Sequence, residues 1–333
     1  CIPARNETED SPGCIESVIA NKYEKLEILV LDDCSHDKTP EIIKQYAHSG
    51  VRFIKGKIPK DDWLPKNSAY DQLADEAKGD VIVFAGVDIR FSTNSVSSLV
   101  SQLTNLDMIS VLPKRSYDKE GSVFIQPLRY WWELGLWRFN AYSPPVLSSC
   151  WAVKRTRLQE IGGFDGLKKA VEPELILAKK FSKLRAYNFL VSSDLLGVES
   201  VKSAKDQYAT ALRTRYIQLQ RKPEYVFLTL FFEFMFFIVP YILFFWSLYT
   251  QDFLPTIWSL SAIIILSVAN AEVYKLALRK LWPIGFISLP FLVIIDWYVM
   301  FKSMYGYEFG KITWKDRNIC IPLLKVEKEL PKA

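Results

Sequence analysis

The sequence contains only five cysteines in 333 residues, and they are widely separated and odd in number. This pattern lacks the spacings of a metal cluster or a disulfide framework, so we interpret the cysteines as reduced thiols on a cytoplasmic domain. The sequence also lacks a basic run interleaved with aromatic residues, and its net charge of +5 is modest. Both observations argue against a nucleic-acid partner.

Apolar residues are the component present in excess. Half of the residues are hydrophobic and 14% are aromatic, both high for a soluble chain. The excess follows residue 225, where three stretches are each long enough to cross about 30 Å of hydrocarbon: roughly 226–249, 254–271 and 284–301. We therefore divide the chain into a first domain, a membrane region and a basic tail, at residues 1–222, 223–304 and 305–333.

Charged residues constrain how the apolar stretches meet a membrane. Glu233 and Asp296 interrupt the first and third stretch, and a carboxylate at a bilayer centre costs on the order of 3 kcal/mol, so we expect both to lie near protein or at an interface rather than in lipid. The basic segment 207–222 and the cluster Lys275, Arg279 and Lys280 mark the cytoplasmic side, with Gln251-Asp252 on the other. Three full crossings would place the basic tail outside, against this charge rule. One stretch re-entering or lying in the interface remains the alternative.

The first 112 residues alternate between apolar runs and segments with helical periodicity, which predicts a parallel α/β sheet. We expect strands at 1–3, 27–31, 51–54, 80–84 and 108–112, and helices at 11–21, 39–48, 67–78 and 94–104. Further along, we expect a strand over 148–153, a helix over 154–161, a helix over 174–181 and a strand over 185–190. Since the sequence begins at Cys1 with most of its first strand missing, we expect it to be part of a longer product.

Acidic residues follow the predicted strands at the points where they end. Asp32 and Asp33 come directly after a buried run, and Asp88 follows another. Ligands of open α/β sheets bind at the carboxyl ends of the strands. We therefore expect these carboxylates to line one site, although a single such acid would more simply be solvated or cap a helix.

Four segments carry a resemblance to a known family. Ile2-Pro-Ala-Arg-Asn-Glu7, the segment 30–39, the segment 79–88 and Ile161-Gly-Gly-Phe-Asp165 resemble, in order and spacing, the motifs of family 2 glycosyltransferases of the GT-A fold. The resemblance implies an α/β, Rossmann-like catalytic domain with a mostly parallel sheet, followed here by transmembrane helices. Trp63 and Lys66 resemble a pattern of membrane-anchored, lipid-directed members of the hopanoid, carotenoid and ceramide type.

The resemblance implies roles for residues of the first three motifs. The family motif Asp-x-Asp reads Gly86-Val-Asp88 here, which leaves Asp88 as the ligand for Mg²⁺ or Mn²⁺. Cys34 stands where the family has glycine, so the turn there is expected to differ. The nucleotide and its diphosphate would be bound by Pro3, Arg5, Glu7, Asp32, Asp33 and Lys66.

The general base is expected at the start of the helix near residue 174. The family places Glu-Asp there, with Leu-Ala three positions after the aspartate, and Leu177-Ala178 lies three positions after Glu174. This register makes Glu174 the base that deprotonates the acceptor, with inversion at the anomeric carbon. In the other register Glu172 matches the glutamate and Pro173 replaces the base. A structural alternative is that both acids favour a helix N-terminus.

Two further elements resemble family motifs in altered form. Arg213, Arg215 and Tyr216 resemble the Gln-x-x-Arg-Trp element that, when complete, accompanies polymer synthesis. Trp314 and Arg317 resemble a Trp-basic-Gly-Arg element near the end of membrane-bound members. These five residues are expected to contact the diphosphate or close the site. If the element with Trp314 and Arg317 closes the site, the tail is cytoplasmic and the number of membrane crossings is even.

The resemblance and the apolar region together predict an inverting, metal-dependent hexosyltransferase at the cell membrane. It would be a multi-pass protein with a cytoplasmic catalytic domain, moving a sugar from a UDP- or GDP-sugar to a lipid. A synthase of polyprenyl-phosphate sugars or short polymers is one alternative. A catalytically inactive, nucleotide-binding membrane scaffold is the other, favoured by Gly86, Cys34 and Pro173 at motif positions.

Overall fold

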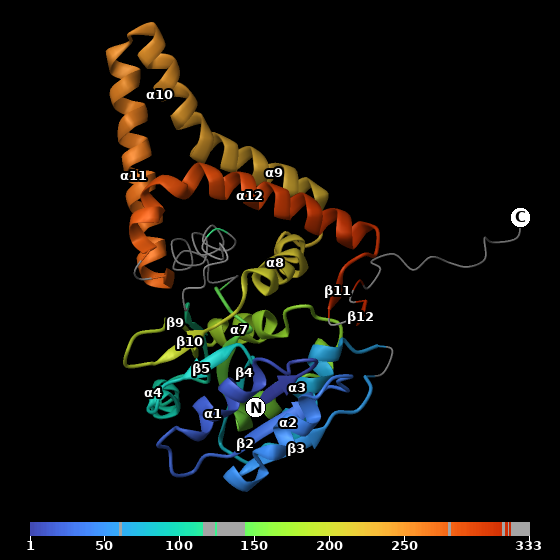
Figure 1. The fold of residues 1–333 in the computed structure, drawn as a ribbon. Coiled ribbons are helices and arrows are strands. Elements are labelled where there is room, and N and C mark those ends of the chain that lie inside the picture. The colour runs from blue at the N-terminus through green and yellow to red at the C-terminus, as the bar shows by residue number, and fades with distance from the viewer. Residues whose placement is uncertain are drawn as a thin grey trace, which may run out of the picture.

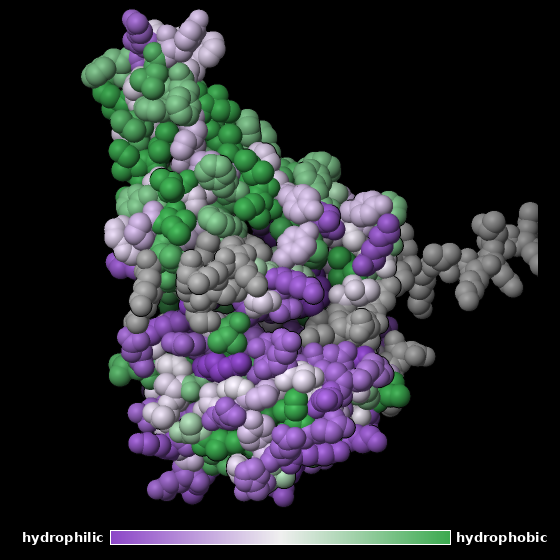
Figure 2. All heavy atoms as spheres, in the orientation of Figure 1, coloured by the Kyte–Doolittle hydropathy of each residue, from purple (hydrophilic) through white to green (hydrophobic). Residues whose placement is uncertain are grey.

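The fold is taken from a computed structural model of the chain, which describes residues 1–59, 62–115, 124, 144–278, 281–314, 317–318 and 320. An α/β domain, which is the catalytic domain expected from the sequence, occupies one end and long apolar helices the other, with α8 (Ala204–Gln218) between them (Figure 1). Hydrophilic residues cover the catalytic domain, and hydrophobic residues gather over the apolar helices (Figure 2).

Parallel strands form the first half of the catalytic sheet. β1 (Ile2–Ala4), β2 (Ile28–Asp32) and β3 (Val51–Lys55) pair in parallel, in the order β1-β2-β3. Every residue of β2 is buried, as its unbroken apolar sequence predicts. The helices of this half are α1 (Ser11–Ile19), α2 (Thr39–Gln45), α3 (Pro65–Glu76) and α4 (Ser95–Gln102).

The second half of the sheet mixes strand directions. β4 (Val81–Ala85), β8 (Cys150–Lys154), β6 (Met108–Leu112) and β9 (Tyr187–Val191) pair in that order, and β8 is antiparallel to both neighbours. The backbone of Cys1 joins the two halves, since its amino group donates to Val83 O at 2.8 Å and its carbonyl accepts from Ala85 N at 3.1 Å. This half also carries α6 (Arg155–Glu160) and α7 (Pro173–Lys183).

A smaller sheet covers one edge of the cleft described below. β10 (Val198–Ser200) pairs antiparallel with β5 (Ile89–Phe91) and parallel with β7 (Lys114–Arg115). The expected strands and helices of the catalytic domain are confirmed with boundary shifts of a few residues, whereas these three short strands were not expected. Strands this short carry too little periodicity to be recognised in a sequence.

A cluster of aromatic rings packs α3 against the centre of the sheet. Phe84 and Trp151 stack with centroids 4.4 Å apart, and Tyr70 and Phe164 contact both rings. Phe164 belongs to the segment Ile161-Gly-Gly-Phe-Asp165, whose two glycines have positive φ and turn the chain so that this ring is buried. The motif therefore has a structural role beneath the cleft.

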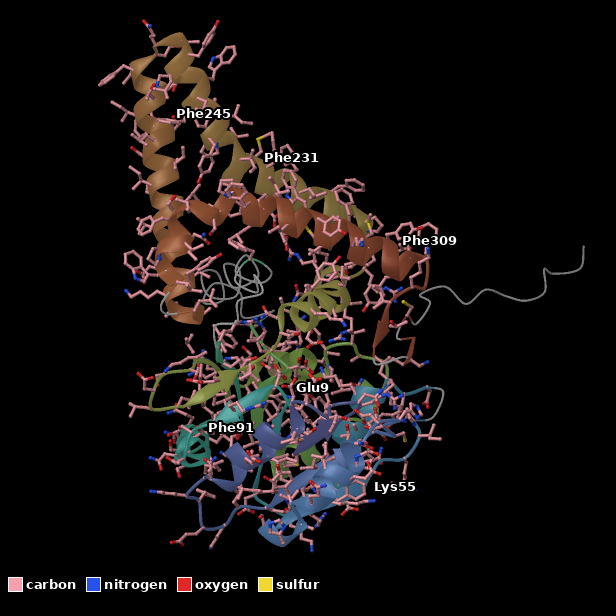
Figure 3. All side chains as sticks on the ribbon, viewed as in Figure 1. Glu9, Lys55, Phe91, Phe231, Phe245 and Phe309 are labelled. Carbon is pink, nitrogen blue, oxygen red and sulfur yellow. The ribbon has the colours of Figure 1, made fainter. Side chains whose placement is uncertain are left out.

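The apolar region forms three helical segments long enough to span a membrane: Pro223–Thr250, Phe253–Leu278 and Trp282–Glu308. The first comprises α9 (Pro223–Glu233), a π-helical turn (Phe234–Ile238) and α10 (Val239–Thr250), and the others are α11 and α12. Phe231, Phe245 and Phe309 lie on these helices, whereas Glu9 and Lys55 lie on the catalytic domain (Figure 3). A short hairpin of β11 (Thr313–Trp314) and β12 (Arg317–Asn318) follows α12.

Candidate active site

A cleft of about 240 Å³ lies between the sheet, α3, α7 and α8. Of the residues singled out in the sequence, Pro3, Glu7, Lys66, Asp88, Glu172, Glu174 and Arg213 line it. They come from segments more than 100 positions apart in the chain. The structure therefore gathers half of the expected site residues in one cleft. Five others do not line it: Arg5, Asp32, Asp33, Arg215 and Tyr216.

The first loop and the end of β2 brace one another beside the cleft. Arg5 donates through Nη1 to the carbonyl oxygens of Asp33 and Cys34, both at 2.6 Å. Cys34 has a φ of +54°, the left-handed region that glycine favours, which explains why a glycine is usual at this turn. Arg5, Asp32 and Asp33 are buried, and they do not belong to the residues that line the cleft. Arg5 therefore holds the two loops together.

Asp88 follows β4 and folds over the glycine that replaces its family partner. Its Oδ2 accepts a hydrogen bond from Ser200 Oγ at 3.0 Å, so β10 orients the carboxylate. A Cβ atom added to Gly86 would lie only 2.5 Å from Asp88 Oδ1. The missing side chain at Gly86 thus leaves the space that the Asp88 carboxylate occupies.

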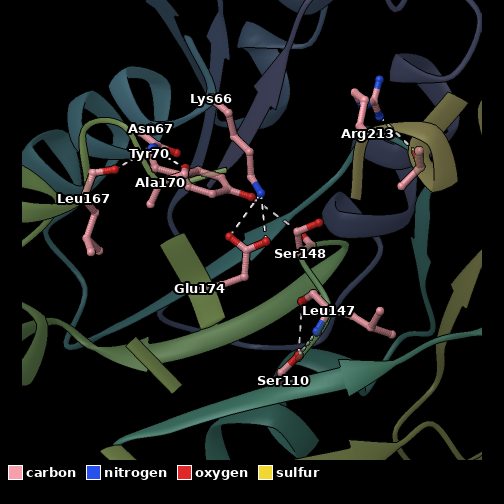
Figure 4. Close-up of polar contacts among 11 residues, drawn as sticks. Lys66, Asn67, Tyr70, Ser110, Leu147, Ser148, Leu167, Ala170, Glu174 and Arg213 are labelled. Atoms are coloured by element: carbon pink, nitrogen blue, oxygen red, sulfur yellow. Dashed lines mark hydrogen bonds and ion pairs between the residues drawn. The ribbon is translucent and has the colours of Figure 1, made fainter. Parts of the chain in front are cut away.

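Lys66 and Glu174 form an ion pair inside the cleft (Figure 4). Lys66 Nζ donates to both carboxylate oxygens, at 2.8 and 3.0 Å. Burial is the largest single effect and disfavours the ammonium charge, but the charge and hydrogen bonds of Glu174, together with Tyr70 and Glu172, raise the pKa of Lys66. Lys66 also lies over the Tyr70 ring, 5.4 Å from its centroid, and burial raises the pKa of Tyr70 to about 12.

The segment that carries the acidic pair is held in place from α3. Buried Asn67 donates through Nδ2 to Leu167 O at 2.6 Å and Ala170 O at 2.8 Å, fixing the chain that leads into α7. Glu172 then occupies the N-cap position and Pro173 the first helical position, so Glu174 lies in the first turn. Both glutamates line the cleft, and Glu174 is the one that is buried.

A cationic wall faces these acids across the cleft. Lys202 follows β10, and Arg213 comes from α8 together with Asp206, Thr210 and Thr214. Burial lowers the pKa of Lys202, although the nearby charge of Asp88 opposes this effect, and burial also lowers the pKa of Arg213. Sequence reasoning missed Lys202. Its only signal is a lysine just after a three-residue strand, which becomes visible once β10 pairs with β5 next to Asp88.

Arg215 and Tyr216 lie on other faces of α8, away from the cleft. Arg215 forms ion pairs with Glu233 on α9, at 3.2 Å, and with Asp296 on α12. Tyr216 is buried, and its hydroxyl lies 2.8 Å from Glu308 Oε1 and 3.0 Å from Arg221 O, either of which can accept its single proton. The expectation that these two side chains bind the diphosphate is therefore corrected: they fasten α8 to the apolar helices. The expected protein surroundings of Glu233 and Asp296 are confirmed.

Several expectations fall outside what the structure describes. The side chains of Trp314 and Arg317 lie outside the described part, although their backbone forms the hairpin after α12. Arg279 and Lys280 also lie outside it. Within the described ranges, no three His, Cys, Asp or Glu side chains gather as a metal cluster. Asp88 stays the predicted metal ligand, and Mg²⁺ is commonly bound by one or two carboxylates together with substrate phosphates and water.

Two comparisons of the sequence with known proteins match glycosyltransferases. The sequence model described as "Glycosyl transferase family 2" matches residues 1–161. A probable glycosyltransferase of Bacillus subtilis, YdaM, is 25% identical over 189 residues, which is 53% of this chain and 44% of that protein. This chain thus spans less than half the length of that curated relative.

A solved structure resembles almost the whole chain. The mannosyltransferase PcManGT from Pyrobaculum calidifontis, in complex with GDP-mannose and Mn²⁺, aligns with a TM-score of 0.55, covering 92% of this chain and 85% of that one at 15% identity. At this identity the likeness concerns the fold, and the expected GT-A architecture is confirmed. Residues 1–161 thus match the family 2 glycosyltransferases, and the curated relative and the shared fold agree with that match.

Proposed function

We propose that this chain transfers a sugar, with inversion, from a nucleotide-sugar donor to a lipid at the membrane face. The observation that carries the proposal is the cleft itself, where Glu174 and Asp88 face the cations Lys202 and Arg213. One wall of this cleft is α8, whose other side contacts the long apolar helices (Figure 1). A lipid hydroxyl at the membrane surface would thus be close to a site for a charged donor.

The leaving diphosphate needs its growing negative charge neutralised. Lys202 and Arg213 are positioned to do this from α8 and the adjoining strand, in a partly buried setting where electrostatic interactions are strong. Asp88 would hold Mg²⁺ or Mn²⁺ together with phosphate oxygens. When bound, the metal ion supplies further stabilisation of charge on the leaving group.

The acceptor hydroxyl needs a base. Glu174 would accept its proton as the acceptor oxygen bonds to the anomeric carbon and the bond to the diphosphate breaks. In the structure both oxygens of Glu174 accept from Lys66. We propose that Lys66 turns toward the diphosphate when the donor binds, which releases Glu174 for the acceptor.

A second candidate is a nucleotide-binding protein without transferase activity. Two features favour it. Gly86 stands at a motif position, and Glu174 is already paired with Lys66. A synthase of polyprenyl-phosphate sugars or short polymers is a third candidate with the same cleft chemistry. The acid lability and length of the labelled product separate it from transfer of one sugar to a neutral lipid.

Membranes containing the protein, incubated with radiolabelled UDP- and GDP-sugars and Mn²⁺ and then extracted for lipid, test the proposal. We expect label in the lipid fraction from one donor, and none from membranes carrying the Glu174→Gln variant. Donor binding without label in lipid, for every donor tried, would contradict transfer and favour the second candidate.

A further inference from the structure

Helix α12 runs along the catalytic domain over most of its length. Near its start, Leu292 packs in one cluster with Leu112, Leu147 and Phe189 of the catalytic domain, together with the end of α11. Near its end, Met300 and Tyr307 pack with Leu64, at the entrance to α3. Both halves of the helix therefore contact residues beneath the membrane region.

Hydrogen bonds fix α12 to α8 in particular. Ser303 Oγ donates to Leu212 O at 2.6 Å, and the Tyr307 hydroxyl donates to Arg213 O at 2.7 Å. Asp296 on α12 forms an ion pair with Arg215 on α8. Residues 296–308 thus lie directly on the wall of the cleft.

This contact sets the depth at which α12 can lie. The cleft has to admit a charged donor from water, so α8 cannot be inside hydrocarbon. The part of α12 that lies on α8 is then at the membrane surface. The remaining residues, 282–295, rise only about 21 Å, which is too short to cross about 30 Å of hydrocarbon.

Helices α10 and α11 differ from α12 in this respect. They project away from the catalytic domain as a hairpin (Figure 1), and the polar turn Gln251-Asp252 forms its tip. Among the described residues, it is the last turns of α11, with Val273, Tyr274 and Ala277, that pack against the catalytic domain. The hairpin therefore leaves the catalytic domain and returns to it.

The outer face of α12 has the chemistry of a membrane surface. Its inward face carries the buried polar residues Ser288 and Ser303, whereas large apolar residues are exposed on the other side. These exposed residues are Ile287, Phe291, Ile294, Tyr298, Phe301, Tyr305 and Phe309. Lysines lie over tyrosine rings along this side: Lys302 over Tyr298, Lys311 over Tyr305 and Lys222 over Tyr225, at 5.2, 5.0 and 5.0 Å from the ring centroids. Tyrosine and lysine are typical of the boundary between headgroups and acyl chains.

We propose that α12 lies flat on one leaflet of a bilayer, with its apolar face among the acyl chains and Lys222, Lys302 and Lys311 toward anionic headgroups. Only the α10–α11 hairpin then enters the hydrocarbon. The catalytic domain and the end of α12 lie on the same side of the membrane, which removes the conflict between three crossings and the basic tail. The inference rests on the proposed function, both for the membrane location and for a cleft that takes up a charged donor from water.

Spin labels on α12 test the proposal in reconstituted bilayers. Single cysteines replace Ile287, Ile294 and Phe301 on the outer face of α12, and Ile265 on α11 serves as the deep reference. The native Cys1, Cys34 and Cys320 are replaced by serine, and Cys14 and Cys150 remain because both are buried and burial raises their pKa to about 12. Depth is read from the ratio of accessibility to oxygen and to a water-soluble nickel chelate.

We expect the three α12 labels at one shallow depth, about 5–10 Å below the headgroups. A crossing helix would instead place the label at 294 near the bilayer centre, with those at 287 and 301 roughly 10 Å shallower, and that profile would overturn the proposal. Labels shielded from both reagents and broadened by one another would show that a second copy of the chain covers this face, which would also overturn it.

Side-specific labelling gives an independent reading without spin probes. Lys311→Cys just after α12 and Ile58→Cys on the catalytic domain are both exposed, and Lys311 lies on the headgroup side in the proposed arrangement. In sealed vesicles of one orientation, a membrane-impermeant maleimide should modify both or neither. Modification of one alone would place them on opposite sides and refute the proposed arrangement. Neither measurement depends on enzymatic activity, so their failure is distinguishable from failure of the proposed reaction.

Discussion

Two buried ion pairs of this molecule differ in how easily a ligand can reach them. One lies in the cleft, and the other lies between α8 and the apolar helices. In the cleft, the Lys66 side chain is 27% exposed beside Glu174. Under the apolar helices, the Arg215 side chain is 10% exposed between Glu233 and Asp296. The first cation can change partner when an anionic ligand enters, whereas the second is enclosed by three helices. A similar pairing would thus serve the proposed chemistry in one place, and it joins the helices in the other.

Loss of the cleft carboxylate should have the largest effect. Glu174→Gln keeps the size of the side chain and removes the base, so transfer should fall about 10²- to 10⁴-fold while the melting temperature and donor binding stay close to the parent. The measurement is single-turnover transfer to lipid.

Glu172→Gln is the matched control, because Glu172 lines the same cleft from the N-cap of the same helix. It should lose much less activity. If Glu172→Gln were inactive and Glu174→Gln nearly normal, the base would be Glu172 and the register chosen from the sequence would be wrong.

Loss of the enclosed cation should act on stability. Arg215→Met leaves the buried Glu233 and Asp296 without their partner, and breaking a buried pair in this way costs about 3–5 kcal/mol. We expect a clear fall in the melting temperature in detergent, and recovery when Glu233→Gln and Asp296→Asn are added.

Arg213→Met, two positions away on α8, is the control for this effect. Since Arg213 lines the cleft, the variant should weaken donor binding and keep most of the stability. Equal destabilisation by both variants would show that the two arginines do not have separate roles.

Replacing the exchangeable cation should have an intermediate effect. Lys66→Met removes charged hydrogen bonds worth about 1.5–3 kcal/mol, or roughly 10- to 150-fold in kcat/KM. If Lys66 turns to the diphosphate, the KM for the donor should rise, as measured by initial rates at varied donor concentration. Lys168→Met, which changes a lysine over the Trp63 ring, should leave KM unchanged. A fall in kcat alone would argue against contact between Lys66 and the donor.

The smallest effect is expected at a carboxylate with acidic neighbours. Burial is the main effect and the negative charge of Asp75 the second, and together they raise the pKa of Asp71 to about 6. Because this folded-state pKa is higher than the unfolded one, its stabilisation is complete below about pH 4 and is lost as the pH rises through about 6. Asp71→Asn should therefore flatten the decline in melting temperature over this range. An unchanged pH dependence would show that Asp71 titrates normally.

The sequence was most informative where a signal is local. The unbroken apolar run 28–31 is recognisable as a buried strand, and a glutamate and proline before an apolar periodicity indicate the start of α7. Lys66, Asp88 and Glu174 stand next to such signals, so their presence in one cleft could be expected from the sequence. Lys202 follows a strand of three residues and could not be singled out in this way.

Side-chain direction was beyond the reach of the sequence. Arg213 and Arg215 belong to one altered motif, yet residues two positions apart on a helix point to different faces. Only the packing of α8 against α9 and α12 sends Arg213 to the cleft and Arg215 to the acids.

The order of apolar and acidic segments along the chain thus determined the alternation of strands and helices, the family motifs and the presence of long apolar helices. Tertiary structure decided which acids face a cation, which arginine reaches the cleft, and which apolar helix lies against the catalytic domain. Local propensity acts over a few neighbours, whereas these decisions depend on contacts between segments that are far apart in the chain.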